Sequence, residues 1–200
     1  TTGIYNVATG SGSLFNNTEG SQNVAIGLNC LLNNTTADNN TAIGHQAMML
    51  NITGASNTAS GYRSLYSNTT GYNNTAVGRN SLYANTTGSY NTANGAYALY
   101  SNTTGAANTA VGRNSLYSNT TGAYNTATGY EALKSGQSYT AGTFTVGVTF
   151  VIAVVGTTDF TLIGASANTV GISFVSTGLG TGTGTATSRN TGSYNTANGY

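Results

Sequence analysis

A repeat with a period of 17 residues is the feature that most constrains how this chain folds. Its clearest copy runs from Asn108 to Tyr124 and reads NTAVGRNSLYSNTTGAY. Eight consecutive copies each open on an asparagine, and a ninth opens at Asn195; the eight are Asn6, Asn23, Asn40, Asn57, Asn74, Asn91, Asn108 and Asn125. A short, strict period indicates a solenoid, in which each unit packs only on its neighbours. Residues that recur in every copy therefore build the rod, and specific chemistry is expected where the pattern changes.

Three positions of the repeat predict the interior and a corner of each coil. Alanine fills the third position of every copy, glycine the fifth, and leucine or methionine the ninth. We expect the alanine and the large aliphatic residue to point inward, and the glycine to mark a corner that needs positive φ or close backbone approach. These structural columns are represented by Ala76, Gly78 and Leu82 in the fifth copy and by Ala110, Gly112 and Leu116 in the seventh.

The remaining positions predict an all-β fold, a parallel β-solenoid (β-roll) with one coil per repeat. We expect two short strands per coil, one centred on Thr-Ala-Val and the other on Ser-Leu-Tyr. Turns such as Asn68–Gly71, with the sequence Asn-Thr-Thr-Gly, connect them. Stacked coils would form parallel sheets with strands about 4.7–4.9 Å apart, and the asparagine columns would form amide ladders along the axis.

The thin interior of each coil predicts assembly into a homotrimer. One Leu and one Ala per coil bury little apolar surface compared with the entropy lost in ordering the backbone of a whole coil. Packing several chains around a common axis would bury a second face. The candidate oligomer contact is the fourth position of the repeat, which holds Ile26, Ile43, Val77 and Val111, and in other copies Thr9, Ser60, Asn94 and Thr128.

The pattern divides the chain into three segments. The repeats predict a solenoid shaft over residues 1–135, and the repeat resumes over residues 190–200. Residues 136–189 differ in composition: the β-branched and aromatic runs at 143–156, 159–165 and 170–178 predict a small inserted β domain, and the Gly-Thr stretch at 178–187 predicts a flexible tail. A domain is tolerated in a solenoid only at a turn that faces solvent, so the Asn-Thr-Thr-Gly turn is expected outside the rod. Receptor recognition and a spacer or collar role are both open for this domain.

The repeat resembles that of a known family. NVAIG at 23–27, and NTAVGRNSL at 74–82 and 108–116, are similar to the head repeats of trimeric autotransporter adhesins, which read approximately Asn-Ser-Val-Ala-Ile-Gly. The turn is longer here, and the form with Asn-Thr-Thr-Gly resembles the repeat arrays of phage and prophage tail-fibre proteins. The resemblance covers residues 1–135 and 190–200. It implies a left-handed parallel β-roll assembled as an intertwined trimer; the handedness rests on this resemblance alone.

Residues that commonly carry catalysis or bind metals are rare and separated in this sequence. Cys30 shares its column with Ser81 and Ser115, so it is interpreted as a small side chain in a small slot, rather than as a reactive thiol. The lone histidine, His45, is expected on the surface. The carboxylates Glu19, Asp38, Glu131 and Asp159 suggest no acid–base pair. The sequence therefore predicts no catalytic residue, no metal, no cofactor and no enzyme activity.

Composition limits the partners. The net charge is +1 and only 4% of residues are charged, which gives no electrostatic basis for a nucleic-acid partner, and no segment predicts membrane insertion. The five basic residues, Arg63, Arg79, Arg113, Lys134 and Arg189, are scattered along the sequence. An aromatic column is formed by Phe15, Tyr66, Tyr83, Tyr100 and Tyr117. Such a column can stack on sugars, but packing between coils is the favoured interpretation.

Together these features predict a structural fibre or adhesin shaft that holds a recognition module away from its anchor. Its site of action would be extracellular, on a virion fibre or a cell surface, and its partners a host surface receptor or glycan. An alternative is an ice-binding solenoid, because one column holds Thr41, Thr58, Thr75, Thr92, Thr109 and Thr126. A second alternative is a subunit of a self-assembling extracellular filament.

Overall fold

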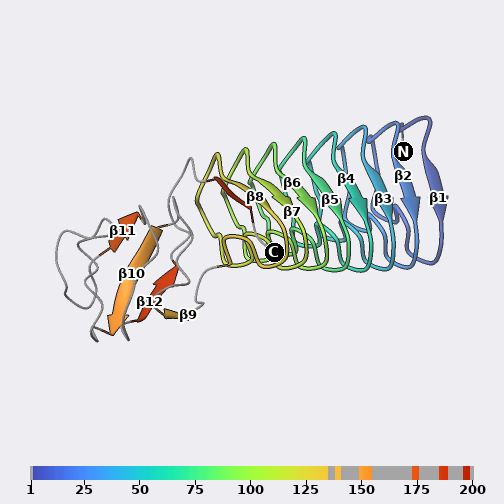
Figure 1. Ribbon diagram of the computed structural model, residues 1–200. Coiled ribbons are helices and arrows are strands. Elements are labelled where there is room, and N and C mark those ends of the chain that lie inside the picture. The colour runs from blue at the N-terminus through green and yellow to red at the C-terminus, as the bar shows by residue number, and fades with distance from the viewer. Residues whose placement is uncertain are drawn as a thin grey trace.

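The repeats form a solenoid with one short parallel strand per coil. The computed structural model describes residues 2–134 and five further strands, at 138–140, 149–154, 173–175, 185–188 and 196–198. In Figure 1 the coils follow one another from blue to yellow, with their strands side by side along the rod. The strands of the eight copies are β1 (Val7–Thr9), β2 (Val24–Ile26), β3 (Thr41–Ile43), β4 (Thr58–Ser60), β5 (Thr75–Val77), β6 (Thr92–Asn94), β7 (Thr109–Val111) and β8 (Thr126–Thr128).

The strand register follows the sequence period without any slip. Each strand pairs in parallel with the strand of the next copy, so that Ala25 lies opposite Ala42 and Ala76 opposite Ala93. Because side chains on a strand alternate between its two faces, this register keeps every alanine on the inner face and its two neighbours on the outer face. The prediction of an all-β parallel β-solenoid with one coil per repeat is confirmed.

The predicted second strand of each coil is wrong. The Ser-Leu-Tyr segment forms a succession of turns, in which Asn80 and Leu82 have φ angles of 55° and 50°. Left-handed residues at alternate positions bend the chain and close the coil, so this side cannot be extended. Hydrogen bonds to the next coil persist nevertheless, as in the bond from Leu65 N–H to the Ser81 carbonyl at 2.9 Å. The segment is thus stacked as regularly as a strand but without β geometry.

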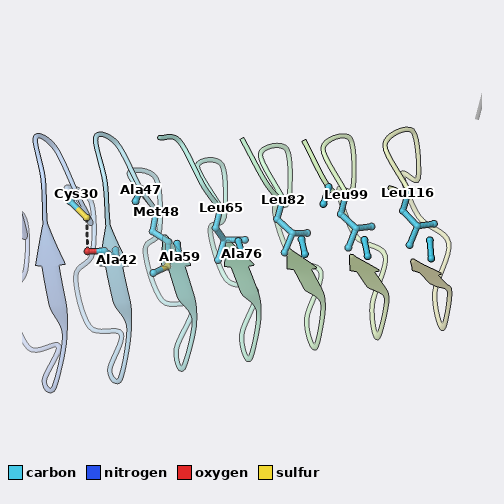
Figure 2. Packing of buried hydrophobic residues seen from close by; sticks show 14 of the residues in the cluster. Cys30, Ala42, Ala47, Met48, Ala59, Leu65, Ala76, Leu82, Leu99 and Leu116 are labelled. Carbon is cyan, nitrogen blue, oxygen red and sulfur yellow. Dashed lines mark hydrogen bonds between the residues drawn. The ribbon is translucent and has the colours of Figure 1, made fainter. Parts of the chain in front are cut away.

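The interior is a single file of alternating large and small apolar side chains. Ala76, Leu82, Ala110 and Leu116 are completely buried. Figure 2 shows Met48 lying beside Ala59 and Leu65 beside Ala76, so the large residue of one copy packs by the strand alanine of the next copy. Contact between successive coils removes these columns from water. The predicted inward direction of both columns is confirmed.

The glycine column forms a corner for both of the predicted reasons. Gly78 and Gly112 have φ angles of 122°, a region that only glycine adopts readily. A Cβ at Gly78 would lie 2.8 Å from the carbonyl carbon of Gly95 in the next coil, and one at Gly112 would collide with the Gly129 carbonyl oxygen. Any side chain at this corner would therefore push two coils apart.

Two buried asparagine ladders run along the rod, as predicted. In the first ladder, Asn91 donates its backbone N–H to Asn74 Oδ1 at 3.0 Å. In the second, Asn85 Nδ2 donates to Asn68 Oδ1 at 2.8 Å. The ladders meet at the turn glycines, where the carbonyl of Gly88 accepts both Asn74 Nδ2 and Asn85 Nδ2, each at 2.9 Å. Buried amides therefore satisfy backbone carbonyl and N–H groups inside the coil.

A separate four-stranded antiparallel sheet lies later in the chain, with the strand order β11-β10-β12-β9. Its strands are β9 (Ser138–Thr140), β10 (Thr149–Val154), β11 (Ser173–Val175) and β12 (Thr185–Ser188). β10 and β11 fall within two of the predicted β runs, and the third run, 159–165, lies outside the described residues. The predicted flexible tail at 178–187 is wrong in part, because its last residues belong to β12. β12 pairs with both β10 and β9. Its Thr and Ala residues therefore form a strand, although their composition predicts a linker.

The solenoid sheet gains a ninth strand after this segment. β13 (Thr196–Asn198) pairs in parallel with β8, and Ala197 lies opposite Ala127. The last copy thus occupies the place of the next coil in the sheet. The boundaries of the inserted domain, 136–189, fall among residues that the structure does not describe and stay a prediction.

Candidate functional site

The outer face of the solenoid sheet carries the predicted oligomer contact. Because Ala points inward, the residues on either side of it in each strand point outward; we call these side chains of β1–β8 the outer sheet face. Four of its apolar members remain substantially exposed in the single chain: Ile26 at 39%, Ile43 at 43%, Val77 at 38% and Val111 at 37%. The fold therefore leaves a row of apolar side chains open to solvent. Association through this row stays a prediction.

Threonines share the outer sheet face with this apolar row. The second position of the repeat holds Thr in six consecutive copies, from Thr41 to Thr126, each paired in register with its neighbour. Neither column contains a charged residue in the eight copies. The outer sheet face is thus uncharged, with one column of hydroxyl groups beside a column of mixed apolar and small polar side chains.

The tyrosine column forms a stacked ladder. Ring centroids of Tyr66 and Tyr83, of Tyr83 and Tyr100, and of Tyr100 and Tyr117 are 5.2, 5.2 and 5.0 Å apart, with planes within 9° of parallel. The four rings are half-buried, and burial together with its tyrosine neighbours raises the pKa of Tyr100. Neighbouring rings cover each other's faces, so these four tyrosines pack between coils; Phe15, the other member of the predicted column, is exposed.

Basic residues that are scattered in the sequence come together on the edge beside this ladder. The Arg63 guanidinium lies over Tyr62 and Tyr66 at 5.2 and 5.4 Å, and the Arg79 guanidinium lies 5.7 Å from the Tyr97 ring. These residues occupy the sixth, seventh and tenth positions of the repeat in copies four to eight, which we call the aromatic–basic edge. The interpretation of the basic residues as an unconnected set is therefore corrected for those in the solenoid.

A signal for this edge was available in the sequence. All four basic residues before the predicted insert, Arg63, Arg79, Arg113 and Lys134, occupy those same three positions of the repeat. Sorting the charges by repeat position, rather than by distance along the chain, would have grouped them. Their grouping follows from stacking, since residues about 17 apart become neighbours along the axis.

The aromatic–basic edge contains a hollow at the end of the tyrosine ladder. It is open to solvent, has a volume of about 480 Å³ and is lined by Tyr97, Arg113, Asn114, Tyr117 and Lys134. Beside it, the Glu131 carboxylate accepts hydrogen bonds from Lys134 Nζ at 2.7 Å and from Asn114 Nδ2 at 3.1 Å. The hydrogen bond from Lys134 is the main reason that the pKa of Glu131 is lowered. The hollow thus combines aromatic walls, an amide and two cationic groups.

Cys30 and His45 have the surroundings that the sequence predicted. Cys30 is completely buried, and its thiol donates to the Ala42 carbonyl at 3.1 Å (Figure 2). Burial raises the pKa of this thiol to about 12, so the reactive thiolate does not form near neutral pH. His45 is exposed and packs edge-on against Tyr62 with ring centroids 5.4 Å apart.

The described part of the chain offers little else for chemistry. No three His, Cys, Asp or Glu residues of that part lie close enough together to hold a metal ion. None of its segments forms a helix long and apolar enough to cross a membrane.

Comparison of the chain with protein families, with curated proteins and with solved structures finds no match. The function is therefore argued from the surfaces described above.

Proposed function

We propose that this chain is the shaft of a homotrimeric fibre or adhesin that acts outside the cell or on a virion and presents a recognition module for host attachment. The observation that carries the proposal is the unbroken stack of coils with an exposed apolar row on its outer sheet face. The ladders, glycine corners and alanine column serve the rod itself, and every copy repeats them. A rod of uniform coils with exposed apolar side chains along one uncharged face is suited to pack against other rods in a bundle.

The extent of exposure supports association through the outer sheet face. Val77 and Val111 lie two coils apart with more than a third of their surface open. Burying this row against the equivalent rows of two other chains would contribute about 25 cal/mol per Å² of apolar surface. The row is continuous only in part, because Asn94 and Ser60 interrupt it. A mixed contact of this kind would hold the chains in register without a large hydrophobic core.

Sedimentation equilibrium on the whole 200-residue chain tests this proposal. We expect a trimer for the unmodified chain and loss of the trimer when Val77→Asp and Val111→Asp are combined, because each change would bury an unpaired charge at the contact. The control carries Thr70→Asp and Thr104→Asp, which place the same charges on exposed turn residues and should leave the trimer intact. A folded, monomeric unmodified chain would contradict the proposal.

Ice binding is a second candidate because of the threonine column on the same face. In-register parallel strands place the Thr41–Thr126 hydroxyl groups at the strand spacing of about 4.7–4.9 Å, on a face without charge. The two functions compete for one surface, since a face covered by other chains cannot contact ice. Inhibition of ice recrystallisation that is abolished by Thr75→Lys with Thr92→Lys, in a monomeric protein, would favour this candidate over the shaft.

A further inference from the structure

We propose that the hollow at the end of the tyrosine ladder binds an anionic saccharide, a pyranose that carries a carboxylate. The site is formed by Tyr97, Arg113, Asn114 and Tyr117, with Lys134 at its border. The hollow is open to solvent, with a volume of about 480 Å³. The site does not rest on the shaft proposal, since it lies on the aromatic–basic edge and not on the outer sheet face.

The charges around the hollow favour an anion. Arg113 lines it directly, and Arg79 lies against Tyr97, one of its walls. The carboxylate beside the hollow, Glu131, is already bonded to Lys134 and Asn114. The positive charge of the two arginines is therefore in excess. A guanidinium presents paired N–H donors that match both oxygens of a carboxylate, which an ammonium group does not.

The aromatic walls favour a sugar ring as the rest of the ligand. Tyr117 is the last ring of the ladder, because the next coil has Lys134 in the same position. One face of Tyr117 is stacked on Tyr100, and the eighth copy has Lys134 instead of a further tyrosine in this column. Tyr97 is tilted by 56° to Tyr100 at 5.7 Å and forms a second wall. The C–H face of a pyranose can pack on an aromatic wall, while phenol and amide groups bond its hydroxyls.

The same geometry disfavours single-stranded nucleic acid. Such ligands bind where several open aromatic faces in succession stack on successive bases. In this ladder the faces of Tyr66, Tyr83 and Tyr100 are stacked on each other with centroids about 5 Å apart, which leaves no space for a base between them. At the Tyr117 end of the ladder the hollow has two tyrosine walls and one arginine, which suits one ring and one charge.

Isothermal titration of the whole chain with trigalacturonate tests the proposal, with the methyl ester of the same trisaccharide as the uncharged comparison. We expect trigalacturonate to bind and its ester to bind at least about tenfold more weakly. Arg113→Gln should weaken trigalacturonate binding about tenfold or more, and Tyr97→Asn should weaken both ligands. Asn fits the left-handed backbone at Tyr97, because the same column holds Asn80 and Asn114 with φ of 55° and 59°. Circular dichroism should show both variants folded.

The matched control is Arg63→Gln, which removes a guanidinium from the same edge but outside the hollow. It should leave the affinity for trigalacturonate within about twofold. The proposal is overturned if the acid and the ester bind equally, if Arg63→Gln weakens binding as much as Arg113→Gln, or if trigalacturonate does not bind at millimolar concentration. It is also overturned if a thymidine oligonucleotide binds this edge and trigalacturonate does not.

Discussion

Each coil has left-handed backbone at three positions besides its corner glycine. The residue type at these positions therefore affects the stability of the coil. The positions are the seventh, the ninth and the seventeenth of the repeat, represented by Asn114, Leu116 and Tyr124 with φ of 59°, 50° and 58°. A side chain in this conformation costs roughly 1–2 kcal/mol, least for Asn and Asp. The seventeenth position is already Asn in two copies, at Asn39 and Asn73. Copies with other residues there carry strain that a substitution can remove.

Ala107→Asn is expected to stabilise the solenoid by about 0.5–1 kcal/mol. Ala107 has φ of 54° and donates its backbone N–H to the Ser89 carbonyl, a bond that the change retains. Asn tolerates this backbone better than Ala because its short polar side chain can bond locally. The free energy of unfolding from urea titration measures the gain. The control is Ala106→Asn, at the adjacent residue with ordinary φ, which should give no gain; equal stabilisation by both would contradict the strain argument.

Cys30 should make the stability of the protein depend on pH above neutrality. Its folded pKa is raised to about 12, whereas an unfolded thiol titrates near about 8.5. Stability is therefore full below pH 8.5 and falls as the pH rises, because only the unfolded chain loses the proton. Between pH 8 and 9.5 the unmodified chain should lose about 1 kcal/mol relative to Cys30→Ser. Ser fits this position, since Ser81 in the same column donates to the Gly78 carbonyl at 3.0 Å. A constant difference between the two proteins across this range would contradict the burial argument.

At the scale of a coil, repeat positions predicted inward and outward sides better than they predicted backbone shape. The roles of Ala76, Gly78 and Leu82 were predicted correctly. A repeat position that holds nearly the same residue in every copy has the same surroundings in every coil. The second strand failed because Ser-Leu-Tyr has strand-like composition, whereas closing a coil of this length requires bends at Asn80 and Leu82. The strand propensity of a residue reflects how its side chain packs on a sheet. The Ser-Leu-Tyr segment packs in the solenoid without belonging to a sheet.

The asparagine ladders are the part of each coil least tolerant of change. Asn85→Ala would remove the acceptor of Asn102 Nδ2, leave Asn68 Oδ1 without its donor, and deprive the Gly88 carbonyl of one bond. Each buried group left unpaired costs about 1–3 kcal/mol, so we expect a loss of several kcal/mol in urea titration. The control is Thr87→Ala, at an exposed turn residue outside the ladders, which should change stability by less than about 0.5 kcal/mol. Similar losses for both variants would show that the ladder has no special role.

At the scale of the molecule, the aromatic–basic edge was not predicted, because it is formed by residues from different coils that become neighbours only when the coils stack. The aromatic–basic edge joins Arg79 to Tyr62 and Tyr97, each about one period away in the chain. No local motif contains these residues. The edge can be recognised in the sequence only when residues are compared by their position in the 17-residue repeat. The reverse holds for β13, which the period alone placed beside β8 across a long stretch of different composition.

Removal of the predicted insert tests whether the rod is continuous across it. Ala127 and Ala197 pair in register, so the chain returns to the solenoid at the next coil. Joining Ser135 directly to Asn190 gives a coil one residue short, because Asn190-Thr191-Gly192 replaces Asn-Thr-Thr-Gly. We therefore expect that the direct join folds with reduced stability, and that one added Thr after Thr191 restores the 17-residue period. Asn190 would then continue the ladder that ends at Asn119.

Thermal unfolding by circular dichroism and rod length by small-angle scattering compare the two joined chains. The chain with the added Thr should unfold at the higher temperature, with a solenoid as long as that of the unmodified protein. Cooperative unfolding of both chains would show that the shaft needs nothing from residues 136–189, as expected if these residues are spliced into a turn. If neither chain folds, the four-stranded sheet contributes to the core of the last coils, and the boundary at residue 135 is misplaced. If the shaft folds, the two joined chains can also be tested for attachment to a host surface. Loss of attachment would place recognition in the insert. Retained attachment would place recognition on the shaft or elsewhere in the polypeptide.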